Sequence, residues 1–290
     1  MSTLRDGPVV ERFATFECGD DTCIGIVASN ADVASRADIG VVIVVGGPQY
    51  RVGSHRQFVT LARALAASGV PALRFDYRGM GDSAGECRNF EHVDTDIGAA
   101  IASLQLETGV ARVVLWGLCD GASAALMYAA ADPRVAGIVL SNPWARSEQI
   151  AAATQVRHYY FRRMMSGDFW RKMLRGDIGV RRSVQELAGA VRGALRDRSG
   201  TDSIHYLQRM HDGLARFRGP VLCVLSGNDF TAREFEAWSD QQPQRKALLT
   251  RPGVEVYRSD AADHTFSDAP SRDAVTTKTI EWITRLRSTR

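Results

Sequence analysis

The chain has 290 residues, 45% of them hydrophobic, which is enough to bury one large core. Its net charge of +3 is close to neutral for this size, so composition favours neither a nucleic-acid partner nor a strongly acidic one. The sequence contains no apolar run of about 18 residues and does not start with the apolar segment of a signal peptide. We therefore expect a cytoplasmic protein without a transmembrane segment.

The cysteines are odd in number and lack the close paired spacing of a structural zinc site. They are Cys18, Cys23, Cys87, Cys119 and Cys223. This pattern argues against a disulfide framework and favours free thiols. Nothing in the sequence indicates a metal ion or an organic cofactor.

Short apolar runs rich in β-branched residues alternate with longer helical patterns along the chain. The predicted strands are 41–45, 72–75, 113–116, 137–140, 221–225 and 254–257, and the predicted helices include 58–68, 93–106 and 122–131. This alternation is typical of βαβ units, and it predicts an α/β fold with a mostly parallel central sheet and helices on both faces. Ligands bind at the carboxyl ends of the strands in such sheets, so the site residues should lie in the loops that follow them.

Residues 144–214 interrupt this alternation, because no β-rich run appears there and arginine, methionine and aromatic residues dominate. We interpret this stretch as a helical cap inserted into a core made of residues 1–143 and 215–290. Its basic residues would form a solvated face; a site for a polyanion or a membrane surface is the alternative.

Two pentapeptides resemble the nucleophile elbow, the sharp strand-to-helix turn that presents the catalytic side chain in α/β-hydrolases. Residues 81–85 (GDSAG) match the G-x-S-x-G pattern literally. However, the preceding strand is predicted to end at Phe75, and the residues that follow the motif are polar and irregular. We therefore expect Ser83 to have a structural role in a loop.

The second pentapeptide, residues 117–121 (GLCDG), directly follows the predicted strand 113–116 and opens the predicted helix at Ala122. Its two glycines relieve crowding at a sharp turn, and the N-terminus of the helix favours the thiolate form of a cysteine. In another context a buried cysteine would be inert packing. The elbow context predicts Cys119 as the nucleophile.

Such a nucleophile needs a histidine base, which comes last in the chain order nucleophile, acid, histidine. Only two histidines lie beyond the centre of the predicted cap. His211 is in a helical stretch, whereas His264 follows the predicted strand 254–257 and lies in the loop where the base belongs. The sequence therefore favours His264.

The acid that orients this histidine should follow an earlier strand. Asp229 closes the loop directly after the predicted strand 221–225, while no carboxylate follows the strand that ends at Leu140. The sequence predicts Asp229 as the acid, with Asp263 as the alternative.

An oxyanion hole requires two backbone N–H groups, one from Asp120 and one from the loop after strand 41–45. In that loop Pro48 has no N–H to donate, so Gln49 is the preferred second donor and Gly47 the next. Two further residues of the loop are candidate substrate contacts, with a solvated loop as the alternative: Arg51 and His55.

Three stretches carry a resemblance to a known family: residues 46–58 (GGPQYRVGSHRQF), 74–83 (RFDYRGMGDS) and 116–123 (WGLCDGAS). They resemble the exosortase A system-associated hydrolases of bacteria, and the resemblance extends over nearly the whole chain, including residues 169–174 (FWRKML). It implies an α/β-hydrolase fold and a link to exopolysaccharide export and exosortase protein sorting. In its elbow chemistry the chain is also similar to dienelactone hydrolase, which uses Cys-His-Asp, but the rest of the chain does not resemble that enzyme.

These residues predict a hydrolase that attacks an ester or a thioester through an acyl-thioenzyme intermediate. Amide hydrolysis is disfavoured, because a thiolate leaves a tetrahedral adduct more readily than an amine does. The substrate would be a small molecule or a lipid-linked acyl compound. Two alternatives stay open: an acyltransferase that uses the same intermediate, and a non-catalytic binding protein on the same fold.

Overall fold

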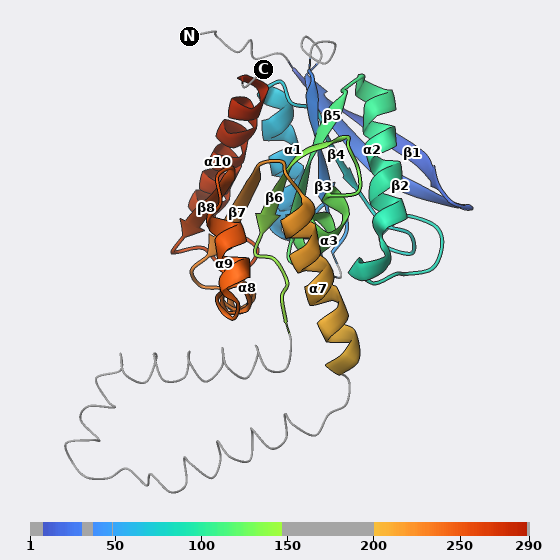
Figure 1. The fold of residues 1–290 in the computed structure, drawn as a ribbon. Coiled ribbons are helices and arrows are strands. Elements are labelled where there is room, and N and C mark those ends of the chain that lie inside the picture. Colours follow the sequence, from blue (N-terminus) through green and yellow to red (C-terminus); the bar gives the residue numbers. More distant parts are fainter. Residues whose placement is uncertain (1–7, 31–36, 48, 147–199, 289–290) are drawn as a thin grey trace, which may run out of the picture.

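The computed structural model describes residues 8–30, 37–47, 49–146 and 200–288. Within them one sheet has eight strands in the order β1-β2-β4-β3-β5-β6-β7-β8 (Figure 1). Strand β2 pairs antiparallel with both β1 and β4, and the remaining pairs are parallel. The strands are β1 Val9–Cys18, β2 Asp21–Asn30, β3 Ile39–Val44, β4 Ala72–Phe75, β5 Arg112–Leu118, β6 Val135–Ser141, β7 Val221–Ser226 and β8 Val254–Ser259.

Helices cover both faces of this sheet (Figure 1). They are α1 Gln57–Ala67, α2 Asp94–Thr108, α3 Asp120–Ala129, α7 Gly200–Arg216, α8 Phe230–Asp240, α9 Pro243–Thr250 and α10 Ala269–Ser288, with short 3-10 helices η2 Ser54–Arg56 and η3 Phe90–His92. Helices α1 and α10 contact each other on one face, while α2 and α7 both contact α3 on the other. The predicted α/β architecture, with a mostly parallel sheet between two helical layers, is confirmed.

The central strands are buried on both faces, which explains why they read as continuous apolar runs. Strands β3, β4 and β7 are buried at every position, whereas the edge strand β8 has no fully buried residue. Because β3 to β8 are parallel, the loops after β3, β5, β6, β7 and β8 leave the same edge of the sheet. Every predicted catalytic residue lies in one of these loops.

The antiparallel hairpin of β1 and β2 was not among the predicted elements. Its first strand covers the core with one side only: Phe13 is 61% exposed and the adjacent Ala14 is 4% exposed. A strand that is buried on one side shows no continuous apolar run, so it lacks the signal that revealed the central strands. Helices α8 and α9 also escaped prediction.

The greater part of the predicted cap, 147–199, lies outside the described residues. The described part of it includes Trp144 and most of α7. The Tyr206 hydroxyl of α7 bonds both the N–H (2.8 Å) and the carbonyl (2.6 Å) of Arg146. These bonds join the segment after β6 to α7.

Candidate active site

Cys119 lies in the turn between β5 and α3, with φ 59° and ψ −128°. Residues other than glycine rarely adopt this left-handed φ, so the turn needs support from its surroundings. The Cys119 N–H donates to the Ser141 carbonyl at 2.9 Å, and the Cys119 carbonyl accepts the Trp144 N–H at 3.1 Å. The end of β6 and the segment after it thereby hold the strand-to-helix turn that the sequence predicted.

Two glycines allow α3 to start this close to the sheet. A Cβ on Gly117 would lie 2.5 Å from Ala122 Cα, and a Cβ on Gly121 would lie 2.5 Å from the Val44 carbonyl oxygen. Both distances are too short for any side chain. The glycine spacing around Cys119 is therefore a packing requirement of this turn.

His264 and Asp229 meet at the same edge of the sheet. His264 Nδ1 lies 2.8 Å from Asp229 Oδ2, and Asp229 is 6% exposed. Because an ionised carboxylate can only accept, Nδ1 carries the hydrogen of this bond. Nε2 is then the ring nitrogen available to the Cys119 thiol, whose interaction with His264 contributes to the raised pKa of the histidine. The structure thus brings the three residues of the predicted triad together.

The charges around His264 favour its protonated form. Burial alone would lower the pKa of His264, but its hydrogen bonds to Asp229 and Cys119, and their charges, raise it to about 10. An imidazole in this setting is a strong acceptor for the thiol proton. The arrangement therefore favours an imidazolium between Asp229 and Cys119.

The alternative acid, Asp263, has other partners. Its carboxylate accepts the N–H groups of Thr265 at 3.1 Å and Ser267 at 3.0 Å, and it also bonds the Ser267 hydroxyl. These bonds order the loop that follows His264. The geometry favours Asp229 over Asp263 as the orienting acid. His211 lies in α7, as its helical pattern indicated.

The loop after β3 contributes the predicted oxyanion donors. Gly47 donates its N–H to Asp120 Oδ1, so this N–H already has an acceptor. Among the described residues the structure records no acceptor for the Gln49 N–H. The Gln49 side chain accepts the Ser54 N–H at 3.2 Å, which ties the loop to η2. The Gln49 N–H is therefore better suited to an oxyanion than that of Gly47.

Asp120 was predicted to contribute its N–H, and its carboxylate is a further feature of the site. Burial raises the pKa of this carboxyl group, while hydrogen bonds from the backbone N–H groups of Gly47, Gly121 and Asp120 itself oppose the shift. An acidic residue in the first turn of a helix is a detectable sequence signal, since the helix dipole favours it there. What the sequence could not reveal is its bond to the loop after β3.

The two candidate substrate contacts differ in their environment. The Arg51 guanidinium forms ion pairs with Asp76 and Asp82, and the backbone N–H of Arg51 donates to Asp76 Oδ1 at 2.6 Å. Arg51 thus joins the loop after β3 to the loop after β4. His55 is exposed and has a left-handed φ of 52°.

Ser83 lies in the loop between β4 and η3, with no strand directly before it and no helix directly after it. Its hydroxyl donates to the Asp76 carbonyl at 2.8 Å and accepts the Ile24 N–H at 2.9 Å. Ser83 therefore links this loop to β2, in the structural role that its sequence context indicated.

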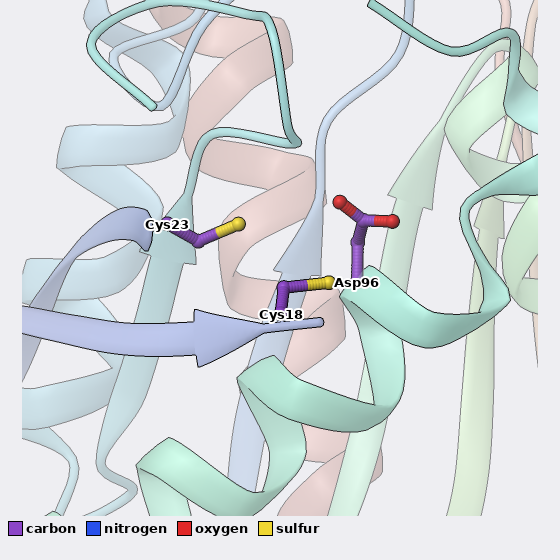
Figure 2. A group of neighbouring side chains, drawn as sticks. All are labelled: Cys18, Cys23 and Asp96. Carbon is purple, nitrogen blue, oxygen red and sulfur yellow. The ribbon is translucent and has the colours of Figure 1, made fainter. Parts of the chain in front are cut away.

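One cluster of potential metal ligands occurs in the described part of the chain. The ligand atoms of Cys18, Cys23 and Asp96 lie within 4.8 Å of one another, and Figure 2 shows the three side chains grouped between the hairpin and α2. However, Arg78 already occupies both oxygens of the Asp96 carboxylate, with Nε–Oδ1 at 3.0 Å and Nη2–Oδ2 at 2.8 Å. A guanidinium in this position opposes a second cation, so the donor set does not fit a metal ion.

All five cysteines are free thiols. Cys119 is partly exposed and Cys87 is exposed, while the other three are buried. Burial is the largest cause that raises the pKa of Cys23 to about 12, and the same cause raises the pKa of Cys223 to about 12. Cys87 is therefore the natural internal reference for any measurement of Cys119 reactivity.

A family model matches the greater part of the chain. Residues 38–239 match the model of a hydrolase family described as serine aminopeptidase, S33. No curated protein sequence matches the chain. No helix among the described residues combines the length and apolar character that crossing a membrane requires.

Solved structures share the fold at low sequence identity. An esterase of Pyrococcus furiosus, Pf2001, has a TM-score of 0.64 at 14% identity, with 96% of this chain and 93% of that chain covered. Est1E of Butyrivibrio proteoclasticus with ferulic acid bound reaches 0.64 at 15%, with 95% and 100% covered. A dienelactone hydrolase of Anabaena variabilis reaches 0.60 at 14%, with 96% and 98% covered. The predicted α/β-hydrolase fold is confirmed.

Proposed function

Because the chain belongs to the hydrolase family described as serine aminopeptidase, S33, we propose that it hydrolyses an ester or thioester with Cys119 in place of the serine that gives the family its name. The observation that carries the proposal is the position of His264, which bonds Asp229 through Nδ1 at 2.8 Å and whose pKa is raised by both Asp229 and Cys119. A base between an orienting acid and a nucleophile is the arrangement that acyl transfer requires.

In the first half of the reaction, His264 Nε2 takes the thiol proton and the Cys119 thiolate attacks the acyl carbonyl carbon. The carbonyl π electrons move to oxygen, where the N–H groups of Asp120 and Gln49 stabilise the negative charge. When the tetrahedral adduct collapses, the bond to the leaving group breaks and His264 returns the proton to it. The products are a free alcohol or thiol and an acyl-thioenzyme.

In the second half, His264 removes a proton from water as the oxygen attacks the thioester carbonyl. Collapse of the second adduct breaks the carbon–sulfur bond, and His264 protonates the departing thiolate. The carboxylic acid leaves and the enzyme returns to its starting state. Because a thiolate leaves more readily than an amine, esters and thioesters suit this nucleophile better than amides.

Two features support the substrate class. The solved neighbours include an esterase of Pyrococcus furiosus, and Est1E of Butyrivibrio proteoclasticus with ferulic acid bound. The resemblance to exosortase A system-associated hydrolases supports a physiological acyl compound linked to exopolysaccharide export, including a lipid-linked one.

Intact mass spectrometry after exposure to a panel of acyl esters and acyl-CoA thioesters tests the proposal. We expect a mass increase equal to one acyl group in the native chain, and none in Cys119→Ala. Equal adduct formation in both proteins would contradict Cys119 as the nucleophile. Total absence of adduct and of released acid across the panel would instead favour a non-catalytic binding protein.

The same adduct distinguishes hydrolysis from acyl transfer. We expect release of free acid at a rate that does not change when a sugar or a primary alcohol is added. Faster loss of the adduct with appearance of an acylated acceptor would assign the chain to the acyltransferases.

A further inference from the structure

We propose that Asn142 is the positioning residue that fixes the His264 loop relative to the strand before Asp229, an inference that rests on the function proposed above. Asn142 follows β6 and is completely buried. Its Nδ2 donates to the His264 carbonyl at 3.0 Å and to Ser226 Oγ at 2.9 Å, and its Oδ1 accepts the Ser226 N–H at 2.8 Å.

The partners of Asn142 determine how its amide is oriented. The His264 carbonyl can only accept a hydrogen bond, so the atom that faces it must be the amide nitrogen. The Ser226 N–H can only donate, so the atom that faces it must be the amide oxygen. The two requirements agree, and both hydrogens of the amide nitrogen have an acceptor. In a flipped amide the oxygen would face the His264 carbonyl and the nitrogen would face the Ser226 N–H, and neither pair could form a hydrogen bond. This buried site therefore fixes the orientation of the amide.

The backbone of Asn142 is fixed as well. Its φ is 43°, in the left-handed region that asparagine tolerates better than most residues. Its N–H donates to the Val224 carbonyl at 2.9 Å, which continues the pairing of β6 with β7. Both the main chain and the side chain of Asn142 are therefore bound to the strand that leads to Asp229.

The main chain of His264 has little other support from side chains among the described residues. Asn142 is the described residue whose side chain bonds the His264 main chain, and it links that main chain to Ser226, three residues before Asp229. Loss of this link would let the imidazole move relative to Asp229 and Cys119. A displacement of about 1 Å at a reacting group can lower the rate of catalysis about 100-fold.

The experiment compares Asn142→Gly with the native chain. Glycine accepts the left-handed φ without strain, so this variant removes the amide and leaves the backbone conformation available. Two quantities are measured: kcat and KM for p-nitrophenyl butyrate, and the rate at which iodoacetamide labels Cys119 relative to Cys87 from pH 6 to pH 10. We expect kcat to fall about 10- to 100-fold with little change in KM. We also expect slower labelling of Cys119 and a changed pH profile.

Asn142→Asp is the second variant, because it is nearly isosteric and keeps an oxygen for the Ser226 N–H. It replaces the amide nitrogen with a carboxylate oxygen, which in its ionised form has no hydrogen to donate to the His264 carbonyl. The proposal therefore predicts the same loss of kcat in this variant.

Asn228→Ala provides a matched control. Asn228 Nδ2 donates at 3.0 Å to the Ala261 carbonyl, in the same loop as His264, but this bond is exposed. Its removal should leave kcat and the labelling profile of Cys119 unchanged.

The outcomes separate this proposal from the proposed function. If native Cys119 is labelled no faster than Cys87 and no ester is turned over, the proposed function fails. If the native chain is active and both Asn142 variants keep its kcat and pH profile, the positioning role fails. Unfolding of both variants, seen by circular dichroism, would assign Asn142 to the stability of the sheet and overturn the proposal.

Discussion

The carboxylate of Asp229 is hydrogen-bonded to His264 while it caps helix α8. It accepts a hydrogen bond from His264 Nδ1 at 2.8 Å. It also accepts hydrogen bonds from the N–H groups of Thr231 and Ala232, at 3.1 Å each. A rotation of this carboxylate would break the cap, so the start of α8 holds the acid in place. The same residue thus joins local helix stability to the geometry of the site.

Asp229→Asn should separate these two roles. Asparagine is a good N-cap, so the variant should stay folded, but its amide can donate to Nδ1 and stabilise the tautomer with hydrogen on Nε2. That tautomer cannot accept the thiol proton, and we expect kcat to fall about 10²- to 10⁴-fold. Steady-state kinetics on p-nitrophenyl butyrate measures this. Asp263→Asn is the control and should leave kcat unchanged; the reverse pattern would assign the orienting role to Asp263.

The bond between Asp120 and Gly47 predicts a difference between two variants. Asp120→Ala removes the acceptor that holds the Gly47 turn, and we expect kcat to fall about 10- to 100-fold because the oxyanion loop is less well ordered. Asp120→Asn keeps an oxygen for the Gly47 N–H and should retain most of the activity. Equal losses in both variants would indicate that the charge of Asp120, rather than its hydrogen bond, matters.

The raised pKa of His264 predicts how stability depends on pH. The pKa of this group is about 10 in the folded chain against 6.5 for an unperturbed histidine, so the folded state holds the proton more tightly. The resulting stabilisation is complete below about pH 6.5 and is lost as the pH rises towards about 10.

His264→Gln lacks this contribution. The free energy of unfolding, measured with urea from about pH 6 to about pH 10, should therefore show a difference between native chain and variant that shrinks as the pH rises. A difference that stays constant over this range would contradict the raised pKa.

The buried ion pair of Arg78 and Asp96 should matter for folding rather than catalysis. Arg78 is 6% exposed and Asp96 is completely buried. Asp96→Asn would leave a buried guanidinium without its counter-charge, and we expect about 3–5 kcal/mol of lost stability. Asp94→Asn is the control: its pair with Arg209, at 3.4 Å, is partly exposed and should contribute less than about 1 kcal/mol. Chemical denaturation of both variants measures the difference, and similar losses would contradict the assignment.

The central strands and the loops of the candidate active site could be predicted from the sequence, because the requirements for forming them are local. A strand buried on both faces needs a continuous apolar run, as in 221–225, and the elbow needs glycines within two residues of Cys119. These requirements leave a mark within a few residues. Ser83 was excluded as the nucleophile because no strand directly precedes its motif and no helix directly follows it. This is also local information, and Ser83 does lie in a loop.

The relations between distant segments were decided only by the tertiary structure. The sequence offered Asp229 and Asp263 as acids, and the hydrogen bond from His264 distinguishes them because it depends on how two loops meet. From the sequence, Asn142 was only a position without a carboxylate. In the structure its amide connects the ends of β6 and β7 to the loop after β8. A hydrogen bond between residues more than 80 positions apart in the chain has no local signature, since it forms only when the sheet brings β6, β7 and the loop after β8 to one edge.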